Sequence, residues 1–136
     1  MRLRSCVAPL LSLLLFNLPE VNAQDVSNGK DFFIVQCLGC HAFTCNKEGP
    51  RLGGLFGRKA ASVEDYGYYS QELQELRNSG IVWTEETLDD FLEDAAKFTP
   101  TGTMADFGKI KDAEQRQQLI AFLKTEDPSV NLCPQE

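Results

Sequence analysis

Apolar residues recur at helical spacing early in the chain. Phe33, Cys37 and Cys40 follow at i, i+4 and i+7, which predicts one continuous face of a helix over residues 28–37. Gly29 extends this face backwards by one turn, although a glycine inside a helix costs about 1 kcal/mol relative to alanine. Close approach of a second helix would explain the glycine, and a weak N-terminal turn is the alternative.

Three more helices are predicted, at residues 71–77, from residue 85 to before residue 98, and at residues 113–124. The last two have apolar stripes: Leu88, Phe91 and Leu92 in one, and Leu119, Ile120, Phe122 and Leu123 in the other. A side chain that can accept backbone N–H bonds precedes each of the four helices: Asp25 or Ser27, then Ser70, Thr84 and Asp112. The pattern therefore predicts an all-α domain of four to five helices.

Two irregular stretches separate these helices, at residues 42–61 and 100–104. The first contains Gly49-Pro50, Gly53-Gly54 and Gly57, which interrupt any periodicity. A loop of this length in a small domain is uncommon unless it has a function. Wrapping a flat cofactor is one such function, because glycines let the backbone lie close to it.

The first residues have the features of a signal peptide. Two arginines precede an apolar run at residues 7–18, and the residues at 21–23 suit a signal peptidase. We predict that residues 1–23 are removed and that residues 24–136 form one domain; an uncleaved anchor is the alternative. The mature chain would have 136 − 23 = 113 residues, with 13 − 2 = 11 basic and 20 − 1 = 19 acidic ones. This acidic balance argues against nucleic acid and against more than transient contact with a membrane surface.

The candidate chemistry lies in Cys37-Leu38-Gly39-Cys40-His41, a C-x-x-C-H sequence typical of covalent haem attachment. The two thiols share one helical face and can reach the vinyl groups along one porphyrin edge. His41 is the only histidine and is the expected proximal ligand of the iron. Met104 is the only methionine besides Met1, so we predict it as the sixth ligand. Lys97, Lys109 and an open or water-ligated site are the alternatives.

Two further cysteines remain, Cys45 and Cys133. In a chain exported to an oxidising compartment we expect them to form a disulfide between the loop after the motif and the C-terminal tail. Two free thiols are the alternative. A thiol oxidoreductase using Cys37 and Cys40 would require a βαβ pattern, which the sequence lacks. Zinc is poorly supported, because one histidine and two nearby cysteines do not complete a tetrahedral site.

These residues together resemble the class I cytochromes c, the soluble electron carriers of mitochondria and bacteria, over about residues 25–125. Gly29, Phe33 and the C-x-x-C-H motif match the N-terminal helix of that family, and residues 49–58 match the segment that follows the haem ligand. The resemblance implies a single-domain fold wrapped around one covalently attached haem c, with the first helix packed against Phe122 of the last.

The resemblance also implies roles for residues around the haem. The Pro50 carbonyl would accept the second imidazole N–H, and Arg58, Trp83 and one tyrosine, taken as Tyr68, would contact the propionates. The chain departs from the family pattern in one extra residue after Met104, in few lysines near the expected haem edge, and in the additional cysteine pair.

The sequence thus predicts a periplasmic monohaem electron carrier rather than an enzyme, because no proton-transfer or nucleophilic group is assembled. The resemblance implies a monomer that meets its redox partners in weak, transient interfaces. Expected partners are a quinol–cytochrome c reductase, a terminal oxidase, a photosynthetic reaction centre or a dehydrogenase. A haem-based sensor or ligand-binding cytochrome with an open sixth site is the main alternative.

Overall fold

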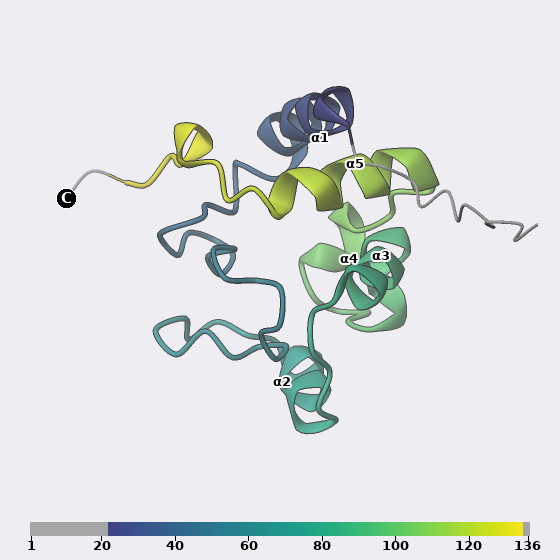
Figure 1. Cartoon of the computed structure of the whole chain (residues 1–136). Helices are drawn as coiled ribbons and strands as arrows, with labels where there is room; N and C mark the ends of the chain where they lie inside the picture. Colours follow the sequence, from purple (N-terminus) through teal and green to yellow (C-terminus); the bar gives the residue numbers. More distant parts are fainter. Residues whose placement is uncertain (1–21, 135–136) are drawn as a thin grey trace, which may run out of the picture.

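The computed structural model describes residues 22–134, so most of the predicted signal peptide, residues 1–21, lies outside the described part (Figure 1). The elements in chain order are α1 (Ala23–Gln36), α2 (Gln71–Asn78), α3 (Glu85–Glu93), the 3₁₀ turn η1 (Ala95–Lys97), α4 (Met104–Phe107), α5 (Ala113–Leu123) and the 3₁₀ turn η2 (Pro128–Val130). The described residues contain no strand, only an isolated bridge between Lys59 and Val82. The predicted all-α class is confirmed. No helix in this range combines the length and the apolar character needed to cross a bilayer.

Capping side chains set most helix starts. The predicted caps of α2, α3 and α5 are confirmed: Ser70, Thr84 and Asp112. The predicted cap of α1 is wrong, because the helix begins at Ala23 and is capped by Asn22, not by Asp25 or Ser27. Asp25 is instead the third helical residue, and its carboxylate accepts the backbone N–H of Asn22 to complete a capping box.

The core forms where α1 crosses α5, at the top of the view in Figure 1. A Cβ at Gly29 would lie 2.5 Å from the carbonyl carbon of Gln118 and 2.9 Å from Cβ of Phe122. Phe33, one turn further along α1, has its ring centroid 5.3 Å from that of Phe122 and 5.4 Å from that of Phe43. The close helix approach predicted from Gly29 is therefore confirmed.

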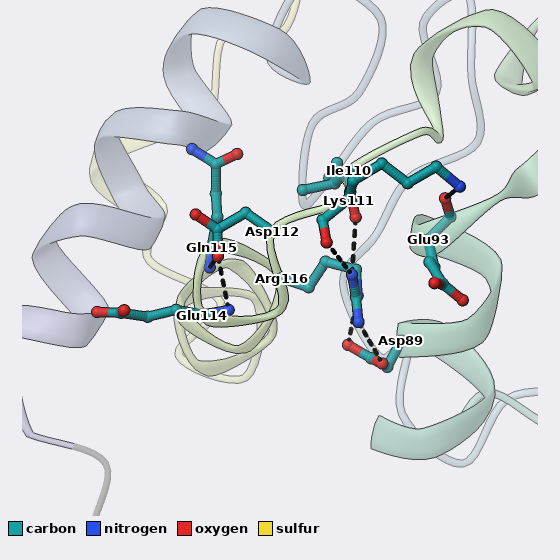
Figure 2. A network of polar contacts seen from close by, with 8 residues as sticks. All are labelled: Asp89, Glu93, Ile110, Lys111, Asp112, Glu114, Gln115 and Arg116. Atoms are coloured by element: carbon teal, nitrogen blue, oxygen red, sulfur yellow. Dashed lines mark hydrogen bonds and ion pairs between the residues drawn. The ribbon is translucent and has the colours of Figure 1, made fainter.

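A buried cation joins α3 to α5 (Figure 2). Arg116 is only 7% exposed and donates to Asp89 from Nε at 2.8 Å and from a terminal nitrogen at 3.2 Å. Its other terminal nitrogen donates to the carbonyls of Ile110 and Lys111, at 2.8 and 3.2 Å. Paired charge and satisfied donors offset the cost of burying the guanidinium. The contact fixes the end of the segment that leads from α4 into α5.

After α5 the chain runs back across the loop that follows the C-x-x-C-H motif. We call residues 126–133 the C-terminal strap. Val130 is buried, and the Lys30 ammonium donates to Asp127 at 2.8 Å. The Asn131 side chain accepts the backbone N–H of Thr44 at 3.1 Å. The strap is therefore attached both to α1 and to the loop that begins at residue 42.

The two additional cysteines lie within this contact. Cys45 and Cys133 are bonded in the structure, with their Cα atoms 5.9 Å apart. The bond closes a sequence separation of 88 residues. It connects the end of the strap to the loop four residues beyond His41.

Candidate functional site

The C-x-x-C-H residues lie in the turn where α1 ends. Cys37 is the C-cap residue of α1, and its carbonyl accepts the backbone N–H groups of Cys40 and His41, at 3.1 and 2.9 Å. Both cysteines are free thiols in the structure, and their sulfurs stand in for the thioether sulfurs of an attached haem. The turn brings Cys37, Cys40 and His41 to the lining of one cavity.

Two adjoining cavities, of about 280 and 130 Å³, lie beneath this turn. Residues from five parts of the chain line both of them: Cys37, His41, Pro50, Tyr69, Leu73, Leu92 and Met104. Cys40 and Tyr68 line the larger cavity only, and Arg58 and Trp83 the smaller one only. The fold therefore brings the predicted site residues, apart from the cysteine pair at positions 45 and 133, to the walls of these two cavities.

The imidazole of His41 is fixed by the loop that follows it. Its Nδ1 lies 2.8 Å from the carbonyl oxygen of Pro50. A carbonyl can only accept, so Nδ1 carries the hydrogen and Nε2 keeps its lone pair. Burial lowers the pKa of His41, and the nearby Lys47 cation adds to this, while the Pro50 bond opposes it. The neutral imidazole with a free Nε2 is the form that binds a metal.

Two hydrogen bonds to neighbouring residues hold the segment 46–50 in place. The Gly49 N–H donates to the Cys40 carbonyl at 2.8 Å, and the Tyr66 hydroxyl donates to the Glu48 carbonyl at 2.5 Å. A Cβ at Gly49 would lie 2.7 Å from Nε2 and 2.8 Å from Nδ1 of His41. The sequence indicated Gly49 as a loop glycine and as the first residue of the segment that resembles the one after the haem ligand, but not its contact with the imidazole. The position of Gly49 directly before Pro50 was the one sequence feature that indicated a place near His41. No neighbouring residue indicated that the Tyr66 hydroxyl would bond to this segment.

Met104 is the first residue of the single turn of α4. The Gly108 N–H donates to the Met104 carbonyl at 2.7 Å, and the Gly108 carbonyl accepts the Ala95 N–H at 2.7 Å. This second bond also explains why α3 ends at Glu93 instead of continuing towards residue 98 as predicted, because Ala95 bonds to a distant segment. Met104 itself is half-buried and faces both cavities.

Arg58 is a half-buried cation at the smaller cavity. Its terminal nitrogens donate to the backbone carbonyls of Gly53, at 2.8 Å, and Arg51, at 2.9 Å. None of the ion pairs within residues 22–134 involves Arg58. Burial lowers the pKa of this guanidinium. A cation oriented by backbone carbonyls beside a cavity suits an anionic ligand group such as a propionate.

Tyr69, rather than Tyr68, lies with Arg58 at the smaller cavity. Tyr68 is 86% exposed at the margin of the larger cavity, whereas Tyr69 is half-buried and lines both. The Val63 N–H donates to the Tyr69 hydroxyl oxygen at 3.2 Å, which leaves the tyrosine O–H available as a donor. Tyrosines so close together in sequence gave no means of choosing between them.

Two rival chemistries do not fit this geometry. Burial raises the pKa of the Cys37 thiol to about 12, and the neighbouring Cys40 adds to the effect. A thiol oxidoreductase needs the opposite, a lowered pKa that produces thiolate near neutral pH. Within the described part of the chain, no cluster of three or more His, Cys, Asp or Glu side chains could hold a metal ion. The donor set fits a haem instead, with two adjacent sulfurs, one neutral imidazole, one thioether and one half-buried cation.

An all-α fold with a C-x-x-C-H turn at the end of its first helix, and with a methionine lining the same cavity as this turn, defines a c-type haem protein. No family model matches the chain. It is 42% identical over 103 residues to a cytochrome c of Gibberella zeae, covering 74% of this chain and 92% of that one. It is 37% identical over 117 residues to a cytochrome c2 of Blastochloris viridis, covering 84% and 87%.

A solved structure gives the same result. Cytochrome cH from Methylobacterium extorquens matches with a TM-score of 0.65 and 35% sequence identity, over 74% of this chain and 98% of that one. The chain therefore belongs to the class I cytochrome c family, and the predicted resemblance is confirmed. Members of this family are electron-transfer proteins rather than enzymes and have one covalently attached haem c with its iron.

Proposed function

We propose that this chain is an exported, periplasmic monohaem electron carrier whose haem is bonded to Cys37 and Cys40, with His41 and Met104 as axial ligands. The observation that carries the proposal is the shared cavity lined by Cys37, His41 and Met104, with Nδ1 of His41 bonded to Pro50 so that Nε2 is free. The haem supplies a one-electron cycle between ferric and ferrous iron.

The surrounding residues tune this cycle. The Met104 thioether favours the ferrous state, and so does the low dielectric of the apolar side chains around the cavity. Arg58, Trp83 and Tyr69 hold the propionates, with the Arg58 cation offsetting their negative charge. Tyr68 contributes at the exposed margin, where a partner approaches. In an oxidising compartment the bond between Cys45 and Cys133 persists and fixes the strap.

The partners follow from the charge of the chain and its family. The whole chain has a formal net charge of −7, and the part after residue 23 would have −8. The carrier is a monomer that exchanges electrons with a quinol–cytochrome c reductase, a terminal oxidase, a reaction centre or a dehydrogenase in small, transient interfaces. The rate of electron transfer to such a partner should depend on ionic strength, and a rate that does not change with salt removes electrostatic steering from the proposal.

A sensor with an open sixth site is the second candidate. It is favoured by the extra residue after Met104 and by Phe107, which is 57% exposed at the larger cavity. Exposure of the ferrous protein to carbon monoxide separates the two functions. The electron carrier should show no spectral change on mixing, while Met104→Ala should bind the gas at once. Rapid binding by the unaltered protein would support the sensor and contradict the carrier.

A further inference from the structure

We propose that Glu126, the first residue of the C-terminal strap, is a positioning residue for the Arg58 guanidinium. Its carboxylate holds the backbone at Gly54, and this backbone directs Arg58 towards the propionate edge of the haem. The inference rests on the proposed function, because the role of Arg58 towards the propionates is part of it.

The backbone at Glu126 is the first observation. Its φ is +48°, in the left-handed region that is unfavourable for a residue with a Cβ. Glycine is the residue that most readily adopts this conformation, and Glu126 lies three residues after the end of α5. A strained conformation persists only where surrounding contacts compensate for it. A glycine at position 126 would avoid the strain but would lack the contact that the Glu126 carboxylate makes.

The side chain of Glu126 reaches the loop that carries Arg58. The Gly54 N–H donates to Oε1 of Glu126 at 2.6 Å, a short distance of the kind expected when the acceptor is charged. The same peptide unit has the Gly53 carbonyl on its other side, and this carbonyl accepts from Arg58 at 2.8 Å. One peptide unit therefore separates the carboxylate from the atom that orients the guanidinium. The Glu126 charge is also near enough to Arg58 to act against the lowering of its pKa.

The position of Glu126 is fixed from both sides. On one side is α5, whose last turn is buried in the core. On the other, Asp127 accepts from the Lys30 ammonium at 2.8 Å and Cys133 is bonded to Cys45. Because the segments before and after Glu126 are both anchored, its carboxylate keeps its position and holds the backbone at Gly54.

Two substitutions separate the hydrogen bond from the charge. Glu126→Gln removes the negative charge but keeps an oxygen that can accept from Gly54. Glu126→Gly removes both and suits the left-handed backbone, so the variant should fold. Glu114→Gln, at an exposed position in the first turn of α5, is the matched control for the loss of one carboxylate.

The first readout is hydrogen exchange at the Gly54 amide, measured by NMR, which does not depend on electron transfer. Exchange should be about fivefold faster in Glu126→Gly than in Glu126→Gln, corresponding to ~1 kcal/mol for the lost bond. Glu114→Gln should leave this exchange rate unchanged. Equal rates in the two Glu126 variants would overturn the inference.

The second readout is the reduction potential of the haem-loaded protein. A fixed Arg58 cation favours the ferrous state, so the potential of Glu126→Gly should lie below that of Glu126→Gln. Equal potentials would overturn the positioning role, since the two variants have the same charge. Arg58→Gln shows which proposal fails. If it lowers the potential but the Glu126 variants are identical, only this inference is wrong. If it leaves the potential unchanged, the propionate role of Arg58 fails and this inference fails with it.

Discussion

Gly49→Ala tests how tightly the loop fixes the imidazole of His41. The added Cβ would lie 2.7 Å from Nε2 and 2.8 Å from Nδ1, whereas ordinary contact begins near 3.4 Å. Cε1, between the two nitrogens, would be closer still, so the ring or the loop must move by more than 3.4 − 2.7 = 0.7 Å. The ring has little freedom, because Nδ1 is bonded to Pro50 on one side and Nε2 would bind the iron on the other.

The cost has two parts. Inserting a methyl group into a packed site costs about 1–3 kcal/mol, and losing the bond to Pro50 costs about 1 kcal/mol more. We therefore expect the free energy of unfolding to fall by about 2–4 kcal/mol. Gly67→Ala is the control, because a Cβ at Gly67 would meet no atom within 4 Å. Its effect should stay within about 0.5 kcal/mol.

Guanidinium unfolding of the haem-loaded protein measures both variants. Circular dichroism follows the helices, and the fluorescence of Trp83, the single tryptophan, follows the cavity that it lines. Coincident transitions would justify two-state analysis. If Gly49→Ala were no less stable than Gly67→Ala and had the same visible spectrum, the close packing of Gly49 on His41 would be refuted.

Three further predictions concern contacts outside this loop. Gly29→Ala should lower the free energy of unfolding by about 1–3 kcal/mol in the same assay, because its Cβ meets backbone of α5; an unchanged midpoint would contradict that helix contact. The bond from Lys30 lowers the pKa of Asp127 to about 2, so its stabilisation is complete above pH 3.8 and is lost as the pH falls towards 2. In an NMR titration Lys30→Met should raise this pKa, and an unaltered value would disprove the ion pair. The Thr101 hydroxyl donates to the Glu72 carboxylate and lowers its pKa, so Thr101→Val should raise the pKa of Glu72 in the same titration. An equal Glu72 pKa in the variant and the unaltered protein would show that α2 does not hold the loop before α4.

Features set by neighbouring residues could be predicted from the sequence. The caps at Ser70, Thr84 and Asp112 depend on a bond to the next helical turn, so their residue type was sufficient. Gly29 was interpretable because a glycine within an apolar helix face needs a close neighbour. The C-x-x-C-H motif was interpretable because its chemistry depends on spacing within a single turn.

Features that depend on distant contacts could not be predicted. Arg116 lies on α5, where an arginine usually faces solvent, and only the position of Asp89 on another helix shows that it is buried and paired. The carboxylate of Glu126 has a role only once the strap lies across Gly54, 72 residues earlier in sequence. The preference for Tyr69 over Tyr68 likewise arises from how the loop folds.

In the proposed electron carrier, His41 and Met104 would both bind the haem iron. The far-red absorption of the ferric protein, where a methionine–iron bond gives a weak charge-transfer band, tests it most directly. We expect this band in the unaltered protein and its complete loss in Met104→Leu. A ferric spectrum without the band, or one that Met104→Leu leaves unchanged, would contradict it.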